Sequence, residues 1–140
     1  MSFNNKYLFP DTAGVNAEGH LTLGGIDVMS LAKEFGTPLY VMDENTLRSR
    51  CRAFVDTFRK RHSNTSVIYA CKAFINPALA MILQEEGLGL DVVSGGELAV
   101  AQRIEYDAKK IYFHGNNKSQ QELEMALTYG IGRVVVDNFH

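Results

Sequence analysis

The sequence predicts an α/β fold in which strands and helices alternate to build a parallel sheet. Apolar strand candidates begin at Val67, Leu90, Ile111 and Val134, at intervals of 23, 21 and 23 residues. Each interval contains a helical pattern, and each helix opens on a residue suited to an N-cap. Such repeats are typical of right-handed βαβ crossovers. They fit either a doubly wound sheet or the first half of a (β/α)8 barrel.

The composition is that of an ordinary globular domain and excludes several classes of protein. Of the 140 residues, 46% are hydrophobic and 21% are charged, which is enough for a core. A net charge of −2 disfavours a nucleic-acid-binding face. Without a signal peptide or an apolar run near the roughly 18 residues that span a bilayer, the expected compartment is the cytoplasm. Cys51 and Cys71 lack the spacing of a zinc site or a disulfide framework, so no metal is expected.

The first 43 residues are expected to form an N-terminal segment outside the repeats. Residues 4–25 are irregular and punctuated by glycine, with brief extended pieces at 7–9 and 20–23. A short helix is predicted over 27–35, with Asp27 near its N-cap and Gly36 just after it. A strand is predicted over 39–42, because Pro38 ends the helical region.

The next helix begins after Asp43, which is expected to cap it. One face carries an apolar stripe about three turns long, and the opposite face is polar, so this helix is predicted to pack one side onto a sheet. The stripe consists of Leu47, Cys51, Phe54, Val55 and Phe58.

The helices inside the repeats carry start and stop signals. The first opens with Asn76-Pro77 and closes at Gly87. The second and third open with Ser-x-x-Glu capping boxes at residues 94–97 and 119–122, and the third closes at Gly130. The glycines after Ser94 also fit a phosphate cradle, but capping and close packing are favoured, because neither G-x-G-x-x-G nor a P-loop lysine is present.

Polar residues follow every predicted strand. Lys72 ends the apolar run 66–74, where low-dielectric surroundings favour a neutral, nucleophilic amine. Asp91, then His114 to Asn117, then Asp137-Asn138 follow the later strands. In both candidate folds these positions meet at the carboxyl edge of the sheet, so the sequence predicts a convergent polar site there.

Three of these motifs, in this order, resemble a known family. They are residues 69–74 (YACKAF), 89–98 (GLDVVSGGEL) and 113–119 (FHGNNKS), preceded by the similar stretch 37–43 (TPLYVMD). They closely resemble the diaminopimelate decarboxylases. This family belongs to the alanine-racemase-like, fold type III group of enzymes that depend on pyridoxal 5'-phosphate (PLP), together with the ornithine and arginine decarboxylases.

The resemblance implies a fold and a site. Residues 44–140 are expected to be the first part of a PLP-binding (β/α)8 TIM-type barrel, and residues 1–43 a β/α segment that packs with a C-terminal β-sandwich domain. Lys72 is implied to form the Schiff base with PLP. Asp91 and Glu97 are implied to orient this lysine and tune its charge, and His114 and Asn116 to line the cofactor pocket.

The resemblance also implies an activity, the decarboxylation of meso-2,6-diaminopimelate to L-lysine by a homodimer. The 140-residue chain is expected to be an N-terminal fragment that is inactive alone, because the family's phosphate site and most substrate contacts lie further along. Two alternatives stay open. One is another fold type III decarboxylase or racemase, and the other is a non-catalytic regulatory homologue.

Overall fold

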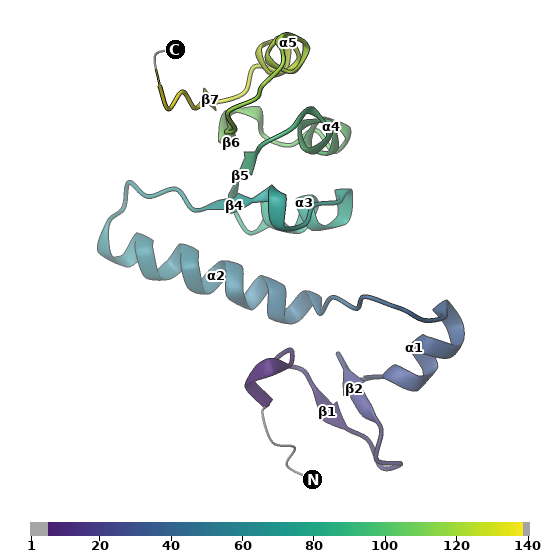
Figure 1. Cartoon of the computed structure of the whole chain (residues 1–140). Coiled ribbons are helices and arrows are strands. Elements are labelled where there is room, and N and C mark those ends of the chain that lie inside the picture. The colour runs from purple at the N-terminus through teal and green to yellow at the C-terminus, as the bar shows by residue number, and fades with distance from the viewer. Residues whose placement is uncertain (1–5, 139–140) are drawn as a thin grey trace. The chain divides into compact units, whose positions relative to one another are not determined.

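The structure is a computed structural model that describes residues 6–138. Its contacts divide the chain after Arg50 into two compact units, and the division falls within one long helix. Each unit is described by itself below. Figure 1 labels their elements.

The first unit is a small antiparallel sheet followed by a short helix. Strands β1 (Gly14–Val15), β2 (Leu21–Leu23) and β3 (Ile26–Asp27) pair in that order. Helix α1 (Val28–Phe35) starts as predicted, because Asp27 accepts a hydrogen bond from the Met29 backbone N–H at 2.8 Å. Gly36 follows α1 with a positive φ of 80°, also as predicted.

Two local predictions in this unit are wrong. The extended piece expected at 7–9 overlaps a 3-10 turn at Lys6–Leu8. Residues 39–42 form no strand, since no described strand pairs with them and their side chains are exposed, Tyr40 completely. An apolar extended segment becomes a strand only when a neighbour satisfies its backbone groups.

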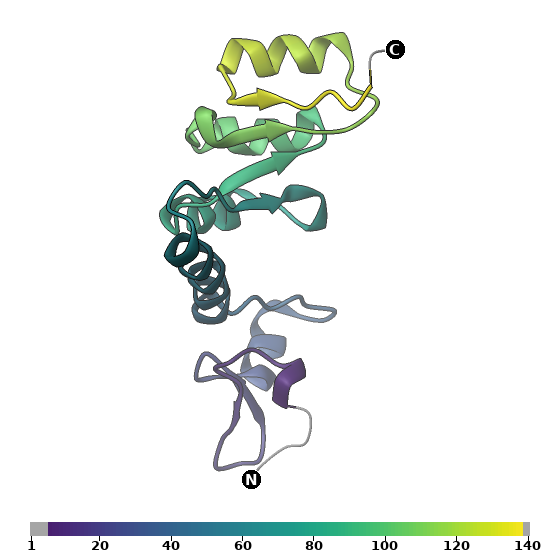
Figure 2. The same cartoon turned by 90° about the vertical axis from the view of Figure 1, so that its left-hand side faces the viewer.

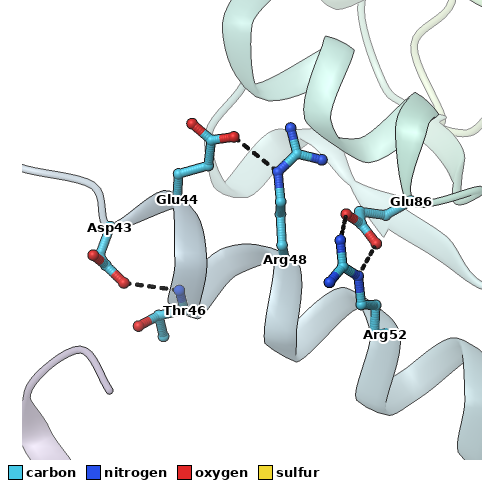
Figure 3. A network of polar contacts seen from close by, with 6 residues as sticks. All are labelled: Asp43, Glu44, Thr46, Arg48, Arg52 and Glu86. Carbon is cyan, nitrogen blue, oxygen red and sulfur yellow. Dashed lines mark hydrogen bonds and ion pairs between the residues drawn. The ribbon is translucent and has the colours of Figure 1, made fainter. Parts of the chain in front are cut away.

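Helix α2 (Glu44–Arg61) is capped by Asp43, whose carboxylate accepts from the Thr46 backbone N–H at 2.8 Å (Figure 3). In the second unit, Arg52 on this helix donates two hydrogen bonds of 2.6 and 2.7 Å to the carboxylate of Glu86 (Figure 3). Cys51 and Val55 are buried as predicted. Phe54 and Phe58 are exposed, so the predicted apolar stripe is wider than the face that the described part of the chain covers.

The second unit contains the predicted parallel sheet. Its strands are β4 (Ile68–Ala70), β5 (Gly89–Val92), β6 (Ile111–Phe113) and β7 (Arg133–Val134), and each pairs in parallel with the next along the chain. Figure 2 shows them side by side. The helices between them are α3 (Pro77–Glu85), α4 (Gly95–Arg103) and α5 (Gln120–Tyr129).

Helices α3, α4 and α5 all lie on one side of the sheet (Figure 1). Sequential strand order with helices on a single face is the arrangement of a (β/α)8 barrel, whereas a doubly wound sheet carries helices on both faces. The core lies between these layers and includes Leu83, Leu90, Leu98, Ile111 and Phe113, all fully buried.

Buried and partly buried side chains alternate along β5 and β6, and this alternation shows which side chains lie on each face of the sheet. In β5, Leu90 and Val92 are buried, and Asp91 between them is only partly buried. In β6, Ile111 and Phe113 are buried, and Tyr112 between them is partly buried. Because neighbouring strand residues point to opposite faces, Asp91 and Tyr112 lie on the face opposite the helices, which is the interior side of a barrel.

Candidate functional site

Lys72 lies in a 3-10 turn (Cys71–Ala73) that follows β4 directly. The hydroxyl of Tyr69 donates to the Phe74 carbonyl at 2.8 Å and ties the two ends of this turn together. Lys72 itself is exposed. The low-dielectric surroundings predicted for it are therefore not supplied by the part of the chain that the structure describes.

Cys71, the residue before Lys72, points into the core and is 2% exposed. Burial, together with the nearby carboxylates of Glu97 and Asp91, raises the pKa of its thiol to about 12. A thiol with this pKa stays protonated near neutral pH and is a poor nucleophile. Cys71 is thus a packing residue that anchors the turn carrying Lys72.

Asp91 and His114 form a pair across neighbouring strands. Asp91 lies in β5, one residue before its end, and His114 follows β6. His114 Nδ1 lies 2.9 Å from Asp91 Oδ1 and 3.1 Å from Oδ2, and the hydrogen-bond angles are met only at Oδ2. Oδ1 is buried and has no hydrogen-bond donor among the described residues. The carboxylate is oriented by the histidine and keeps one oxygen available as an acceptor.

A cavity of about 440 Å³ opens at the carboxyl edge of the sheet. This volume is within the ~300–1,000 Å³ typical of small-molecule sites. Four of the five predicted site residues line it, namely Lys72, Asp91, His114 and Asn116. The structure also adds Val93, Gly115, Val135 and Asp137 to its walls. Of these, Asp137 and Gly115 belong to stretches that the sequence analysis placed after strands, whereas Val93 and Val135 carry no chemical signal.

Glu97, the fifth predicted residue, does not line this cavity. Ser94 caps α4 as predicted, because its hydroxyl accepts from the Glu97 backbone N–H at 3.3 Å. The Glu97 carboxylate, however, accepts from the backbone N–H of Val93 at 2.8 Å, one residue before the expected capping-box partner. Glu97 therefore fixes the backbone of Val93, a cavity-lining residue.

The start of α4 is occupied by a protein carboxylate. Glu122 accepts from the Gly95 backbone N–H at 2.7 Å and completes the predicted capping box with Ser119. A Cβ on Gly95 would lie 3.0 Å from Glu122 Cγ, so a larger residue there would crowd the Glu122 side chain. These contacts support the capping interpretation of residues 94–96 over a phosphate cradle.

Two kinds of feature are absent from residues 6–138. No cluster of three or more histidine, cysteine or acidic side chains in this range could hold a metal ion. No helix in this range combines the length and apolar character needed to cross a bilayer.

A family model described as the pyridoxal-binding domain of pyridoxal-dependent decarboxylases matches residues 44–140. The chain belongs to this decarboxylase family. Among curated family members, diaminopimelate decarboxylase of Bacillus methanolicus is 52% identical over 132 residues, covering 94% of this chain and 31% of the relative. The chain therefore spans about a third of the length of that decarboxylase.

Solved structures of family members share the fold. Diaminopimelate decarboxylase from M. jannaschii, in complex with L-lysine, matches with a TM-score of 0.79 and 35% identity, over 90% of this chain and 30% of the other. Lysine/ornithine decarboxylase from Vibrio vulnificus, complexed with putrescine, matches with a TM-score of 0.72 and 25% identity, over 90% and 32%. The predicted barrel-type fold is confirmed.

The residues of the cavity fit a pyridoxal cofactor. Lys72 offers an amine, Asp91 offers a buried carboxylate oxygen without a donor, and Asn116 offers a side-chain amide. An aldehyde-bearing, hydrogen-bonding heterocycle needs groups of these kinds.

Proposed function

We propose that this chain carries the lysine-bearing wall of the PLP site in a diaminopimelate decarboxylase, which converts meso-2,6-diaminopimelate to L-lysine. The observation that carries the proposal is the convergence of Lys72, Asp91, His114 and Asn116 on one cavity at the carboxyl edge of the sheet. In barrels of this kind the chemistry lies at that edge. The similarity to the Bacillus methanolicus enzyme supports the choice of substrate.

Each residue has a proposed task. Lys72 supplies the amine that holds the cofactor. The Asp91 carboxylate is oriented by His114 and accepts a hydrogen bond through Oδ1. This hydrogen bond positions the Lys72 amine and its protons. Asn116 donates from its side-chain amide to the polar edge of the cofactor. PLP, when bound, supplies the electron sink that makes loss of the substrate carboxylate as CO₂ feasible.

Glu97 has an indirect task in this proposal. Its carboxylate accepts a hydrogen bond from the Val93 backbone N–H, and its negative charge helps to raise the pKa of the buried Cys71 thiol. We propose that Glu97 orients the turn carrying Lys72 through these neighbours.

The wider organisation is also a proposal. Residues 1–43 pack with a C-terminal β-sandwich domain, and residues 44–140 begin the barrel. The exposed apolar side chains of the N-terminal segment, among them Leu8, Met29, Phe35, Tyr40 and Met42, support a covering partner. The full-length enzyme is proposed to be a cytoplasmic homodimer, and the 140-residue chain alone is proposed to lack activity.

The test is borohydride reduction of the full-length protein after incubation with PLP, followed by peptide mapping. We expect a stable pyridoxyl adduct on Lys72 and none in the Lys72→Ala variant. Absence of the adduct from the wild-type protein would overturn the enzyme assignment in favour of a non-catalytic homologue.

The substrate is tested by CO₂ release from meso-diaminopimelate, L-lysine, L-ornithine and L-arginine, with alanine racemisation as a further assay. We expect decarboxylation of meso-diaminopimelate alone. Preferred turnover of another amino acid would instead support a different fold type III enzyme. CO₂ release by the 140-residue chain would contradict its proposed inactivity.

A further inference from the structure

Lys118 connects two segments that line the cavity. It lies between β6 and α5, directly before the N-cap Ser119, and is partly buried. Its Nζ donates to the carbonyl of Gly115 in its own loop and to the carbonyl of Val135 after β7, the latter at 3.0 Å. The Nζ atom also lies 5.9 Å from the ring centroid of Phe113. Lys118 itself is not among the residues that line the cavity.

Both carbonyls belong to cavity-lining residues in consecutive βα repeats. Gly115 precedes Asn116 on one wall, and Val135 precedes Asp137 by two residues on the next wall. A lysine carries three donors and no acceptor, so two backbone carbonyls are natural partners for its amine. The Lys118 side chain therefore donates to one backbone carbonyl in each of the two loops.

The loop that contains Gly115 has a backbone conformation that favours glycine. Gly115 has a φ of +104°, which L side chains rarely adopt, and a Cβ there would lie 3.4 Å from the Val93 carbonyl oxygen. Backbone hydrogen bonds hold the strand ends below, from His114 to Val92 and from Val135 to Phe113. Among the described residues the strand pairing ends at these points, and Lys118 is a cross-link between the two loops beyond them.

We infer that Lys118 is a positioning residue that holds the Gly115–Asn116 and Val135–Asp137 walls at a fixed separation, so that Asn116 and Asp137 are placed for the cofactor before it binds. This inference rests on the proposed function, because it takes the cavity to be the PLP site. Its structural part, the clamp between two loops, does not depend on the cofactor. Preorganised walls lower the ordering cost of binding.

The test compares the full-length wild-type protein with Lys118→Met, which keeps the apolar stem but removes the donors. Lys60→Met, an exposed lysine in the last turn of α2, is the matched control. Hydrogen exchange without PLP is expected to rise about tenfold in residues 114–117 and 135–138, from the loss of two hydrogen bonds, and to stay unchanged in α3 and α4. The dissociation constant for PLP, from absorbance titration, is expected to rise about tenfold as well. Lys60→Met should match the wild type in both measurements.

Two results would overturn the inference. One is wild-type exchange in both segments of Lys118→Met. The other is a uniform rise in exchange over the whole protein with an unchanged PLP dissociation constant, which would mean a purely structural lysine.

If Lys118→Met does not fold, Lys118→Arg takes its place, because a planar guanidinium cannot reproduce the geometry of an ammonium between two carbonyls. Lys118→Arg should raise hydrogen exchange in residues 135–138. Exchange at the wild-type rate in this segment would also overturn the inference. A wild-type protein that binds no PLP would instead overturn the proposed function and leave the exchange comparison intact.

Discussion

His114 Nδ1 lies 2.9 Å from Asp91 Oδ1, across the neighbouring parallel strands β5 and β6. The two residues are 23 positions apart in the sequence, two more than the 21-residue register in which Asp91 pairs with Tyr112. Because Asp91 is near the end of β5 and His114 is just past the end of β6, the two side chains meet at the carboxyl edge of the sheet although they are not register partners. Their side chains are 23% and 48% exposed, so the pair is partly screened by water.

The Asp91–His114 pair is expected to be weakly stabilising. A double-mutant cycle with Asp91→Asn and His114→Asn should give a coupling energy of about 0.5–1 kcal/mol in urea unfolding, since the pair is partly exposed. Under the proposed function, Asp91→Asn should also lower meso-diaminopimelate decarboxylation about 100-fold. Additive single-mutant effects would contradict the pairing, and unchanged turnover would contradict the proposed task of Asp91.

Arg52→Lys is expected to destabilise the protein although it keeps the charge. The Arg52 guanidinium makes a two-point contact with Glu86, which is 7% exposed, whereas Arg52 itself is 62% exposed (Figure 3). A lysine cannot form this fork, and solvent screening limits the loss to about 0.5–1 kcal/mol in urea unfolding. Arg48→Lys, whose partner Glu44 lies one turn earlier in the same helix, is the control and should cost less. Equal losses for both variants would argue against the two-point contact.

Tyr106→Phe should be costly because the hydroxyl is buried and has one partner. Tyr106 is 1% exposed and donates to the Leu88 carbonyl at 2.7 Å. Removing the hydroxyl leaves that carbonyl without a donor, at a cost of about 1–2 kcal/mol in chemical denaturation. Tyr129→Phe removes a similar hydrogen bond, to the Tyr106 carbonyl, from a less buried tyrosine and should cost less. The reverse order would contradict the burial of Tyr106.

The Cys71 thiol should resist alkylation in the native protein. Burial raises its pKa from 9.0 to about 12, so iodoacetamide at pH 8 should modify Cys71 only after unfolding, as judged by peptide mass spectrometry. The same shift favours the folded state below pH 9.0, and this contribution is lost as the pH rises toward 12. Rapid native labelling of Cys71 would show that the turn carrying Lys72 opens readily.

Glu122 should contribute to acid sensitivity. Hydrogen bonds from the Ser119 backbone, the Gly95 backbone and the Ser119 hydroxyl lower its pKa below the ordinary value of 4.5. Its stabilisation is therefore present above pH 4.5 and is lost as the pH falls through the lowered pKa. The difference in Tm between the wild type and Glu122→Gln should shrink from pH 7 to pH 3. A constant difference would exclude a role for the Glu122 charge.

Local sequence patterns were sufficient to predict most of the elements, and four of the five predicted site residues line the cavity. The positions of Asp27, Asp43, Asn76, Ser94 and Ser119 marked the helix starts, because a capping side chain bonds to a backbone N–H within three residues. Lys72, Asp91, His114 and Asn116 followed strands, and parallel pairing brings strand ends together.

Other features were decided only by the tertiary structure. Lys118 meets Val135 across 17 residues, and Glu122 meets Gly95 across 27. Glu97 bonds to Val93 and lies outside the cavity, although its sequence context fits a capping box. Phe54 belongs to an apolar stripe and is nevertheless exposed. Periodicity and caps depend on neighbours within one helical turn, whereas these contacts depend on strand register and on which surfaces meet, and no short stretch of sequence encodes either.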